Sequence, residues 1–295
     1  MTVDRRAIHL YNDYIHGSMA RRDFLARLIG IAGSAAAATA LLSVLEPNHA
    51  HARQVAEHDP RVHAERVRYP GVDGPVNAYL ARPATPSGPL PAVLVIHENR
   101  GLNPHIEDVA RRLALAGYLA LAPDGLSVAG GAPTDQEQAR DLFAATDRAR
   151  IDADVMAGIP FLSGSALTDH GGGNGRVGAV GFCYGGGIAL RCAAEFPDAT
   201  GAAVCFYGRA LTAEQVARVK APLTLHYAGE DPRINADIPE FRRVLDANRI
   251  AYSLHMYPGT QHGFHNDASA ARYDWAAAAL AWQRTLAFFD HHLKS

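Results

Sequence analysis

The sequence contains little of what marks several classes of protein. Its 295 residues include only three cysteines and two tryptophans, and the formal net charge is −2. Three thiols make a poor disulfide framework, and no excess of basic residues signals binding to nucleic acid. No low-complexity tract is long enough to indicate general disorder. These absences leave a globular protein, with enough chain for one large α/β domain or two small ones.

Glycine patterns typical of nucleotide binding are also missing. The glycine-rich stretch at residues 168–175 contains neither G-x-G-x-x-G nor a P-loop lysine. We interpret this stretch as a flexible surface connection between two regular elements.

The N-terminal part of the chain has the composition of a targeting segment. Arg21-Arg22-Asp23-Phe24-Leu25 resembles a twin-arginine export signal, residues 28–45 carry no charge, and Ala50-His51-Ala52 offers a small-x-small cleavage site. The moderate hydrophobicity suits a signal that is read in folded form better than a permanent membrane span. We therefore expect residues 1–52 to be a leader recognised by the twin-arginine export machinery. The mature protein would then be periplasmic, without a stable membrane span.

An uncleaved leader is the alternative. Residues 7–16 have the pattern of a helix of their own ahead of the two arginines. A retained amphipathic segment would leave a cytoplasmic or membrane-anchored protein. In either case we set residues 1–52 aside and assign residues 53–295 to the folded domain.

Beyond residue 60 the chain alternates between strand and helix patterns. Residues 66–69 and 76–80 predict an antiparallel hairpin, with its turn at residues 71–74. Alternating strands and helices imply a mostly parallel, doubly wound α/β sheet, whose functional loops lie at the carboxyl ends of the strands. The further strands are expected at 92–96, 119–124, 177–181, 202–207, 223–228 and 252–257, and the helices at 106–116, 135–162, 184 onward, 212–219, 240–247 and 268–293.

One thiol stands where a strand pattern meets a helix pattern. The run Gly181-Phe182-Cys183-Tyr184-Gly185 fits the nucleophile elbow G-x-nucleophile-x-G, with cysteine where serine is usual. The two outer glycines fit positions where a Cβ would collide with a neighbouring element. The start of the following helix favours an anion, and hence a thiolate at Cys183. The alternative is an inert buried thiol, which is our interpretation of Cys192 and Cys205.

A thiolate at an elbow needs a base and a carboxylate that orients the base. Asp231 follows the strand pattern at 223–228, and His262 follows the last strand pattern. The order nucleophile, acid, histidine is the order that the α/β-hydrolase arrangement requires. Glu230 is the alternative acid and His265 the alternative base. His262 and His265 also have loose metal-ligand spacing, but no third ligand lies nearby in the sequence.

These motifs resemble the dienelactone hydrolase (carboxymethylenebutenolidase) family of α/β-hydrolases over nearly the whole chain from about residue 60. The resemblance implies an α/β-hydrolase fold, a Cys-His-Asp triad of Cys183, His262 and Asp231, and no need for a metal or organic cofactor. The matching stretches are His97-Glu98-Asn99-Arg100-Gly101-Leu102, Ala122-Pro123-Asp124, Gly181-Phe182-Cys183-Tyr184-Gly185-Gly186, Tyr207-Gly208, Gly229-Glu230-Asp231 and His262-Gly263-Phe264.

The resemblance also assigns a role to Glu98. By resemblance, this glutamate holds the resting thiol and releases it when an anionic substrate arrives. The alternative for Glu98 is a salt bridge to Arg100. The oxyanion hole is expected from the backbone N–H groups of Tyr184, directly after the nucleophile, and of Asn99.

Substrate-binding residues follow the family pattern less closely. Relatives that act on dienelactone bind its carboxylate with arginines, one of them shortly after the catalytic histidine. Here that segment reads His265-Asn266-Asp267, and the first arginine beyond it is Arg272. The candidates are therefore Arg100 and Arg140 as cations, with Tyr207 and Phe264 as apolar lining. For these two aromatic side chains, packing in the core is the default interpretation.

The sequence thus predicts a hydrolase of small carboxylic esters or lactones that works through a covalent acyl-enzyme. A thioesterase or small peptidase is the rival activity, because the same residues can process thioesters. A catalytically silent relative that only binds a ligand is the rival from another class. A panel of aryl esters, lactones and acyl thioesters separates these alternatives.

Overall fold

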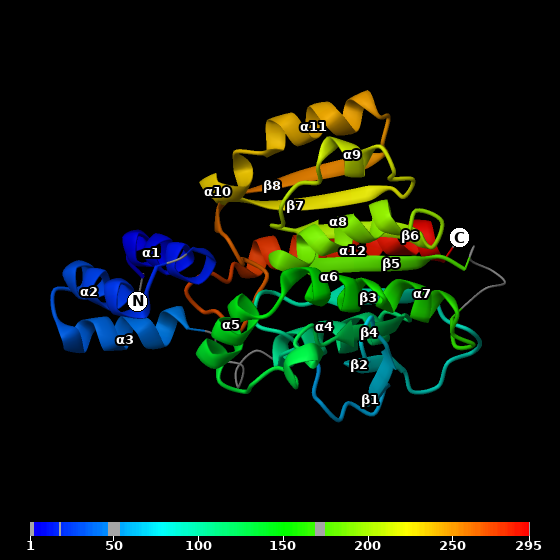
Figure 1. Cartoon of the computed structure of the whole chain (residues 1–295), viewed down its shortest axis with the longest axis horizontal. Coiled ribbons are helices and arrows are strands. Elements are labelled where there is room, and N and C mark those ends of the chain that lie inside the picture. Colours follow the sequence, from blue (N-terminus) through cyan, green and yellow to red (C-terminus); the bar gives the residue numbers. More distant parts are fainter. Residues whose placement is uncertain (1–2, 18, 47–53, 169–174, 295) are drawn as a thin grey trace.

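The computed structural model describes residues 3–17, 19–46, 54–168 and 175–294. One eight-stranded sheet runs through the molecule in the order β1-β2-β4-β3-β5-β6-β7-β8 (Figure 1). The pairs β1–β2 and β2–β4 are antiparallel and all the others are parallel. The strands are β1 (Val62–Pro70), β2 (Pro75–Pro83), β3 (Ala92–Ile96), β4 (Leu119–Pro123), β5 (Val177–Phe182), β6 (Thr200–Phe206), β7 (Leu223–Glu230) and β8 (Tyr252–Gln261). The predicted hairpin and the predicted doubly wound sheet are confirmed.

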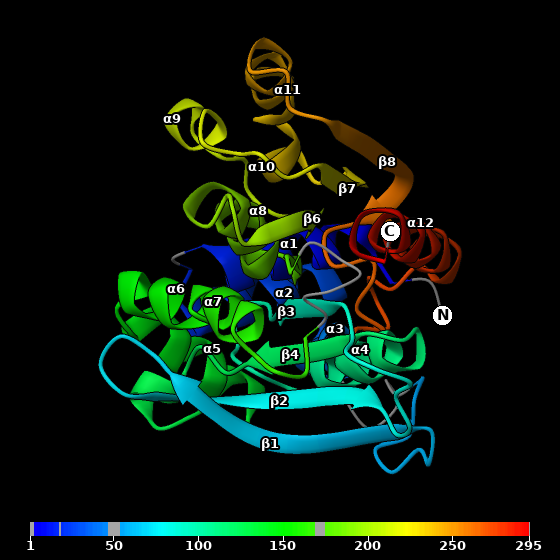
Figure 2. The same cartoon turned by 90° about the vertical axis from the view of Figure 1, so that its right-hand side faces the viewer.

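Helices cover both faces of this sheet, which explains why its central strands are apolar at every position. Along β3, Val93 and Val95 pack in the layer that contains α4 and α12, whereas Leu94 and Ile96 pack toward α6, α7 and α8. Figure 2 shows these two layers on either side of the strands. The helices of this region are α4 (Pro104–Leu115), α5 (Gln136–Ala145), α6 (Arg148–Met156), α7 (Gly158–Ser163), α8 (Tyr184–Glu195), α9 (Ala213–Val216), α10 (Pro232–Asn235), α11 (Ile238–Ala247) and α12 (Trp275–Leu293), with a 3₁₀ turn at Ser127–Ala129.

Two predicted helices were wrong in their extent. The pattern at 135–162 forms three helices, because Asp147 caps a new helix by accepting the N–H of Ala149, and the chain bends again before Gly158. A Cβ on Gly158 would collide with Leu94, so close contact with the sheet is what this glycine permits. The last helix begins at Trp275, where the carboxylate of Asp274 accepts the N–H of Ala277.

The N-terminal segment, which the sequence analysis set aside, is folded. It forms α1 (Arg5–His16), α2 (Arg21–Ala32) and α3 (Ala35–Leu45), and the helix predicted at residues 7–16 is confirmed. The three helices share their own hydrophobic cluster. In Figure 1 they lie at one end of the sheet, beside α5 and α10.

The leader interpretation of this segment stays a prediction. Arg21 and Arg22 begin α2, and the proposed cleavage site Ala50-His51-Ala52 lies outside the described residues. Among the described helices none alone is long and apolar enough to cross a membrane. The α2–α3 pair, bent by 110°, satisfies length and composition only when both helices are taken together.

Candidate active site

Cys183 stands at a tight turn between β5 and α8. Its backbone has φ 54° and ψ −114°, a conformation that costs energy for a residue with a Cβ and that is common at functional turns. A Cβ on Gly181 would collide with the backbone of Gly185, and one on Gly185 would collide with the carbonyls of Ile96 and His97. The steric role predicted for these two glycines is confirmed.

Asp231 and His262 meet beside this turn because β7 and β8 are neighbouring parallel strands whose ends lie at the same edge. The Nδ1 atom of His262 is 2.5 Å from Oδ2 of Asp231. A ring nitrogen of His262 and Sγ of Cys183 lie within 4.8 Å of each other. The three residues are 8% (Cys183), 5% (Asp231) and 2% (His262) exposed. The structure therefore brings together the three residues that the sequence predicted as a triad.

The positive charge of His262 and the negative charge of Asp231 stabilise each other. Burial alone would lower the pKa of His262, but the negative charge of Cys183 and the hydrogen bond to Asp231 outweigh it and raise this pKa to about 9. Burial would raise the pKa of Asp231, yet its hydrogen bond with His262 holds this pKa below the usual value. The site is therefore arranged to stabilise a positive imidazolium at His262, between Asp231 and Cys183.

The alternative acid and base lie elsewhere. Glu230 accepts a hydrogen bond from Gln261 at 2.6 Å and pairs with Arg5 at 2.9 Å, away from the ring of His262. The ring of His265 stacks on Phe182 with their centroids 5.0 Å apart. Among the described residues, the group with metal-ligand spacing is His16, Cys183 and His262 rather than His262 with His265.

Glu98 is buried but does not pair with Arg100. Its Oε2 accepts a hydrogen bond from Nδ2 of Asn266 at 2.7 Å, and burial, which would raise its pKa, is outweighed by the charge of Arg272 among others, so this pKa is lowered. Arg100 instead donates to the Gln136 carbonyl and to the Tyr11 hydroxyl. The expected role of Glu98 in holding the thiol stays a prediction.

The two expected oxyanion donors lie on adjacent elements. Tyr184 is the first residue of α8, where helix N–H groups lack intrahelical partners. Asn99 follows β3, which pairs with β5 at Ile96 and Gly181. The side chain of Asn99 donates to the Ile15 carbonyl at 2.9 Å. The use of these two N–H groups as an oxyanion hole stays a prediction.

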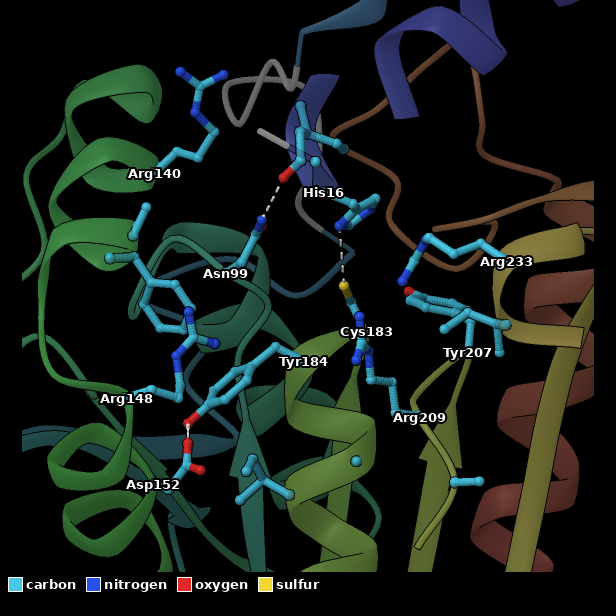
Figure 3. A pocket seen from close by; sticks show the side chains of 18 of the residues that line it. His16, Asn99, Arg140, Arg148, Asp152, Cys183, Tyr184, Tyr207, Arg209 and Arg233 are labelled. Carbon is cyan, nitrogen blue, oxygen red and sulfur yellow. Dashed lines mark hydrogen bonds between the residues drawn. The ribbon is translucent and has the colours of Figure 1, made fainter. Parts of the chain in front are cut away.

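A cavity of about 660 Å³ opens over Cys183 and receives side chains from the N-terminal helices as well as from the sheet domain (Figure 3). Of the four substrate-binding candidates, Arg140 and Tyr207 line it and Arg100 and Phe264 do not. Phe264 packs in the core, which was its default interpretation, and substrate binding by Arg140 and Tyr207 stays a prediction. Arg100 is 5% exposed and held by its hydrogen bonds, and Phe264 is fully buried against Tyr207 and Tyr257.

Among the cavity residues that the sequence analysis did not find are His16, Arg148, Arg209 and Arg233. Arg209 follows the Tyr207-Gly208 motif and Arg233 follows Asp231-Pro232, so each comes just after a motif residue at a strand end. That position is the signal that could have found them. Within the described part of the chain, no ion pair involves Arg209 or Arg233, whereas Arg140 pairs with Asp141 at 2.6 Å.

The loop after His262 is fixed by a buried charge network centred on Asp267. This carboxylate is 2.8 Å from Nδ1 of His105 and 2.6 Å from Arg112, and it accepts from Gln54 at 3.0 Å. Burial would raise the pKa of Asp267, but the hydrogen bond with His105 and the charge of Arg112 outweigh it and lower this pKa. The segment directly after His262 is thus tied to α4.

This network predicts a defined pH dependence of stability. A lowered carboxyl pKa stabilises the fold above the unfolded value near 4, and that contribution is lost as the pH falls from about 4 through the lower folded value. We expect Asp267→Asn to lower the free energy of unfolding by about 3 kcal/mol at pH 7. Urea unfolding of both proteins at about pH 7, 4 and 3 measures the gap between their free energies of unfolding, which should narrow toward acid pH. A gap that widens toward acid pH would contradict the assignment.

Comparisons with known proteins show the family to which the chain belongs. Residues 76–293 match the sequence pattern of a protein family described as "Dienelactone hydrolase family". A provisionally named carboxymethylenebutenolidase from Methylorubrum extorquens is 32% identical over 289 residues, covering 93% of this chain and 96% of the relative. A provisionally named hydrolase fragment from Escherichia coli is 56% identical over 107 residues, covering 36% of this chain and 92% of the fragment.

A solved structure shows the same architecture. The crystal structure of a provisionally assigned dienelactone hydrolase from Klebsiella pneumoniae has 30% sequence identity and a TM-score of 0.68, and the match covers 77% of this chain and 98% of that chain. The expected α/β-hydrolase fold is confirmed. Helices α1–α3 lie before the range that the family description matches. The chain belongs to the dienelactone hydrolase family, a family of hydrolases.

Proposed function

We propose that this protein hydrolyses small carboxylic esters or lactones through Cys183, His262 and Asp231. The observation that carries the proposal is the position of His262, whose Nδ1 meets Asp231 at 2.5 Å and which lies within 4.8 Å of the Cys183 sulfur. The Nε2 atom of His262 has no hydrogen-bond partner among the described residues. It is therefore free to exchange a proton with the thiol, and apo geometry of this kind is commonly looser than in the complex with substrate.

The reaction follows from these positions in two halves. The Cys183 thiolate attacks the acyl carbon, and the carbonyl oxygen becomes an oxyanion that backbone N–H groups can stabilise. When the C–O bond breaks, His262 gives its proton to the leaving alkoxide and an acyl thioester remains on Cys183. In the second half His262 takes a proton from water, the hydroxide adds to the thioester, and the C–S bond breaks to release the acid. Asp231 keeps the imidazole in the required tautomer throughout.

The cavity also indicates the charge of the substrate. Arg209 and Arg233 line it without a carboxylate partner among the described residues. Figure 3 shows both side chains directed toward Cys183, whereas the Arg140 guanidinium points away. Two unpaired guanidinium groups beside the nucleophile favour an ester or lactone that carries a carboxylate or another anion. They supply the cations that the segment after His262 lacks.

Removing one of these arginines should affect anionic substrates selectively. We expect Arg233→Gln to lower kcat/KM for an aryl ester with an acyl carboxylate by roughly 10- to 100-fold, since a hydrogen bond to a charged group contributes about 1.5–3 kcal/mol. The neutral ester of the same acyl length should change by no more than about 3-fold. Steady-state kinetics with both esters provides the test. Equal losses for the two esters would contradict charge recognition.

A matched control is available on an exposed helix. Arg243 on α11 is paired with Glu240 at 2.6 Å and does not line the cavity. Arg243→Gln should leave both esters unaffected, so that a loss in Arg233→Gln reflects the position of the charge and not the net charge of the protein.

Thioester or peptide hydrolysis remains the rival activity, because the same acyl-enzyme can form from those substrates. The panel of aryl esters, lactones and acyl thioesters is therefore the deciding experiment. Highest kcat/KM with an ester or lactone supports the proposal. Turnover of thioesters or peptides alone would overturn it, and no turnover of any substrate would favour a ligand-binding relative.

A further inference from the structure

The N-terminal helices are attached to the active site by polar contacts as well as by apolar packing. Helix α1 reaches the loop after β3, where the Ile15 carbonyl accepts from Asn99 and the Tyr11 hydroxyl accepts from Arg100 at 3.1 Å. It also reaches the strand-end residue Glu230 through Arg5 at 2.9 Å. Two elements that carry candidate site residues, the loop after β3 and the end of β7, are therefore in contact with a single helix that lies outside residues 76–293, the range matched by the family.

Further contacts join these helices to α5, on the other side of the cavity. The Tyr14 hydroxyl is 3.1 Å from Oε1 of Glu137, and Arg21 forms an ion pair with the same carboxylate. The guanidinium of Arg140 lies over the ring of Tyr14 at 4.1 Å. The segment at residues 3–46 thus bridges the cavity from the strand ends to α5.

His16, the last residue of α1, ends beside the nucleophile. Its Nδ1 is 3.9 Å from Sγ of Cys183, and its ring meets the ring of His262 edge-on with centroids 4.5 Å apart. Its Nε2 is buried without a partner in the described part of the chain. In Figure 3 the His16 side chain points at the sulfur from the open side of the cavity. It therefore occupies the space that an acyl group must share.

His16 is badly placed to serve as a second catalytic base. No carboxylate among the described residues holds either of its ring nitrogens. Burial first, and then the charges of His262, Arg233, Arg272 and Arg100, keep its pKa well below the usual value, so the ring is neutral at physiological pH. A neutral imidazole that contacts the sulfur but is held by no carboxylate among the described residues acts through its volume and contact surface.

We propose that the helices in residues 3–17 and 19–46 form a lid that belongs to the working enzyme, and that His16 on this lid is a specificity-determining residue which limits the size of the acyl group beside Cys183. The inference rests on the proposed function, because it presumes that an acyl group binds at this sulfur. It goes beyond that function by placing part of the substrate pocket on a segment whose composition resembles a leader.

Shortening His16 should widen the range of acyl groups that the enzyme accepts. Each additional methylene that finds apolar contact contributes about 0.8 kcal/mol, or roughly 4-fold in kcat/KM. We expect His16→Ala to raise the ratio of kcat/KM for a hexanoyl aryl ester to that for the acetyl ester by about 10-fold or more. His16→Phe, which keeps a ring at this position, should retain the wild-type ratio.

Two controls make the outcome decisive. His9 lies on the exposed face of the same helix, so His9→Ala should leave the ratio unchanged. An unchanged ratio in His16→Ala, with acetyl ester turnover retained, overturns the inference but leaves the proposed function intact. Wild-type turnover in Cys183→Ala would overturn both. If His16→Phe raised the hexanoyl-to-acetyl ratio of kcat/KM as much as His16→Ala does, the ring's volume would not be what selects the acyl group.

Retention of the lid can be measured directly on the protein made by cells that export it. Intact-mass analysis of the active protein from the periplasmic fraction should show a chain that contains His16. An active species that begins at Arg53 and has the wild-type acyl preference would contradict a lid that belongs to the working enzyme.

Discussion

Replacing Cys183 with alanine is expected to lower kcat/KM for an activated aryl ester by about 1000-fold or more, because no group remains to accept the acyl chain. Rapid, stoichiometric alkylation of the protein by iodoacetamide should be lost with it. Steady-state kinetics and mass spectrometry of the alkylated protein measure the two effects. Turnover in Cys183→Ala within a few-fold of wild type would show that Cys183 is not the nucleophile.

Cys192 provides the matched control for that substitution. It lies on α8, the helix that begins after Cys183, and it is fully buried, which raises its pKa well above the usual value. Such a thiol is inert. Cys192→Ala should keep wild-type turnover and alkylation stoichiometry, although it removes a buried atom and lowers the free energy of unfolding by about 1 kcal/mol.

Replacing Asp231 with asparagine is expected to have the second largest effect, a loss in kcat of roughly 10²- to 10⁴-fold. An amide cannot stabilise the imidazolium that forms on His262, and it favours the wrong tautomer of the ring. The loss should appear in kcat with little change in KM, because Asp231 acts on the base and does not contact the substrate. Steady-state kinetics on one aryl ester gives both constants.

Glu230→Gln is the control for Asp231→Asn, because this neighbouring carboxylate was the alternative acid in the sequence. Its partners are Gln261 and Arg5, so its loss should leave kcat within about 3-fold of wild type. The reverse pattern, with a large loss in Glu230→Gln and little change in Asp231→Asn, would assign the acid to Glu230.

The elbow and its partners could be predicted because local sequence and chain order determine them. Glycines at 181 and 185 indicate a turn that only a strand-to-helix transition needs. In a parallel sheet, residues that follow strands lie at one edge, so Asp231 and His262 were expected to meet once β7 and β8 were recognised. The geometry of the three residues follows from topology more than from side-chain detail.

The lid could not be predicted because its composition indicates two things at once. An alanine-rich uncharged stretch after two arginines is typical of an export signal, and it is equally typical of a small helix packed on a domain. What distinguishes them is burial by distant residues, such as Tyr11 against Arg100 and Arg272. Contacts of this kind, between residues far apart in the chain, leave no local pattern in the sequence.

The cavity arginines were missed for a related reason. Arg209 lies in a loop and Arg233 in the four-residue helix α10, and neither segment is long enough for a periodicity that shows which way a side chain points. Phe264 was a candidate for the cavity lining, yet the chain turns at Gly263, with φ 84°, and the ring enters the core. Proximity in sequence to a predicted site residue is therefore a poor guide to the lining of the cavity.

The most direct test is to trap the acyl group on the protein. Wild-type enzyme mixed with an excess of a slowly turned-over aryl ester, quenched in acid and digested, should carry one acyl group on the peptide that contains Cys183. The same treatment of Cys183→Ala should yield no acylated peptide. An acyl group on another residue of the wild-type protein, or turnover without any trapped adduct that continues in Cys183→Ala, would contradict the account.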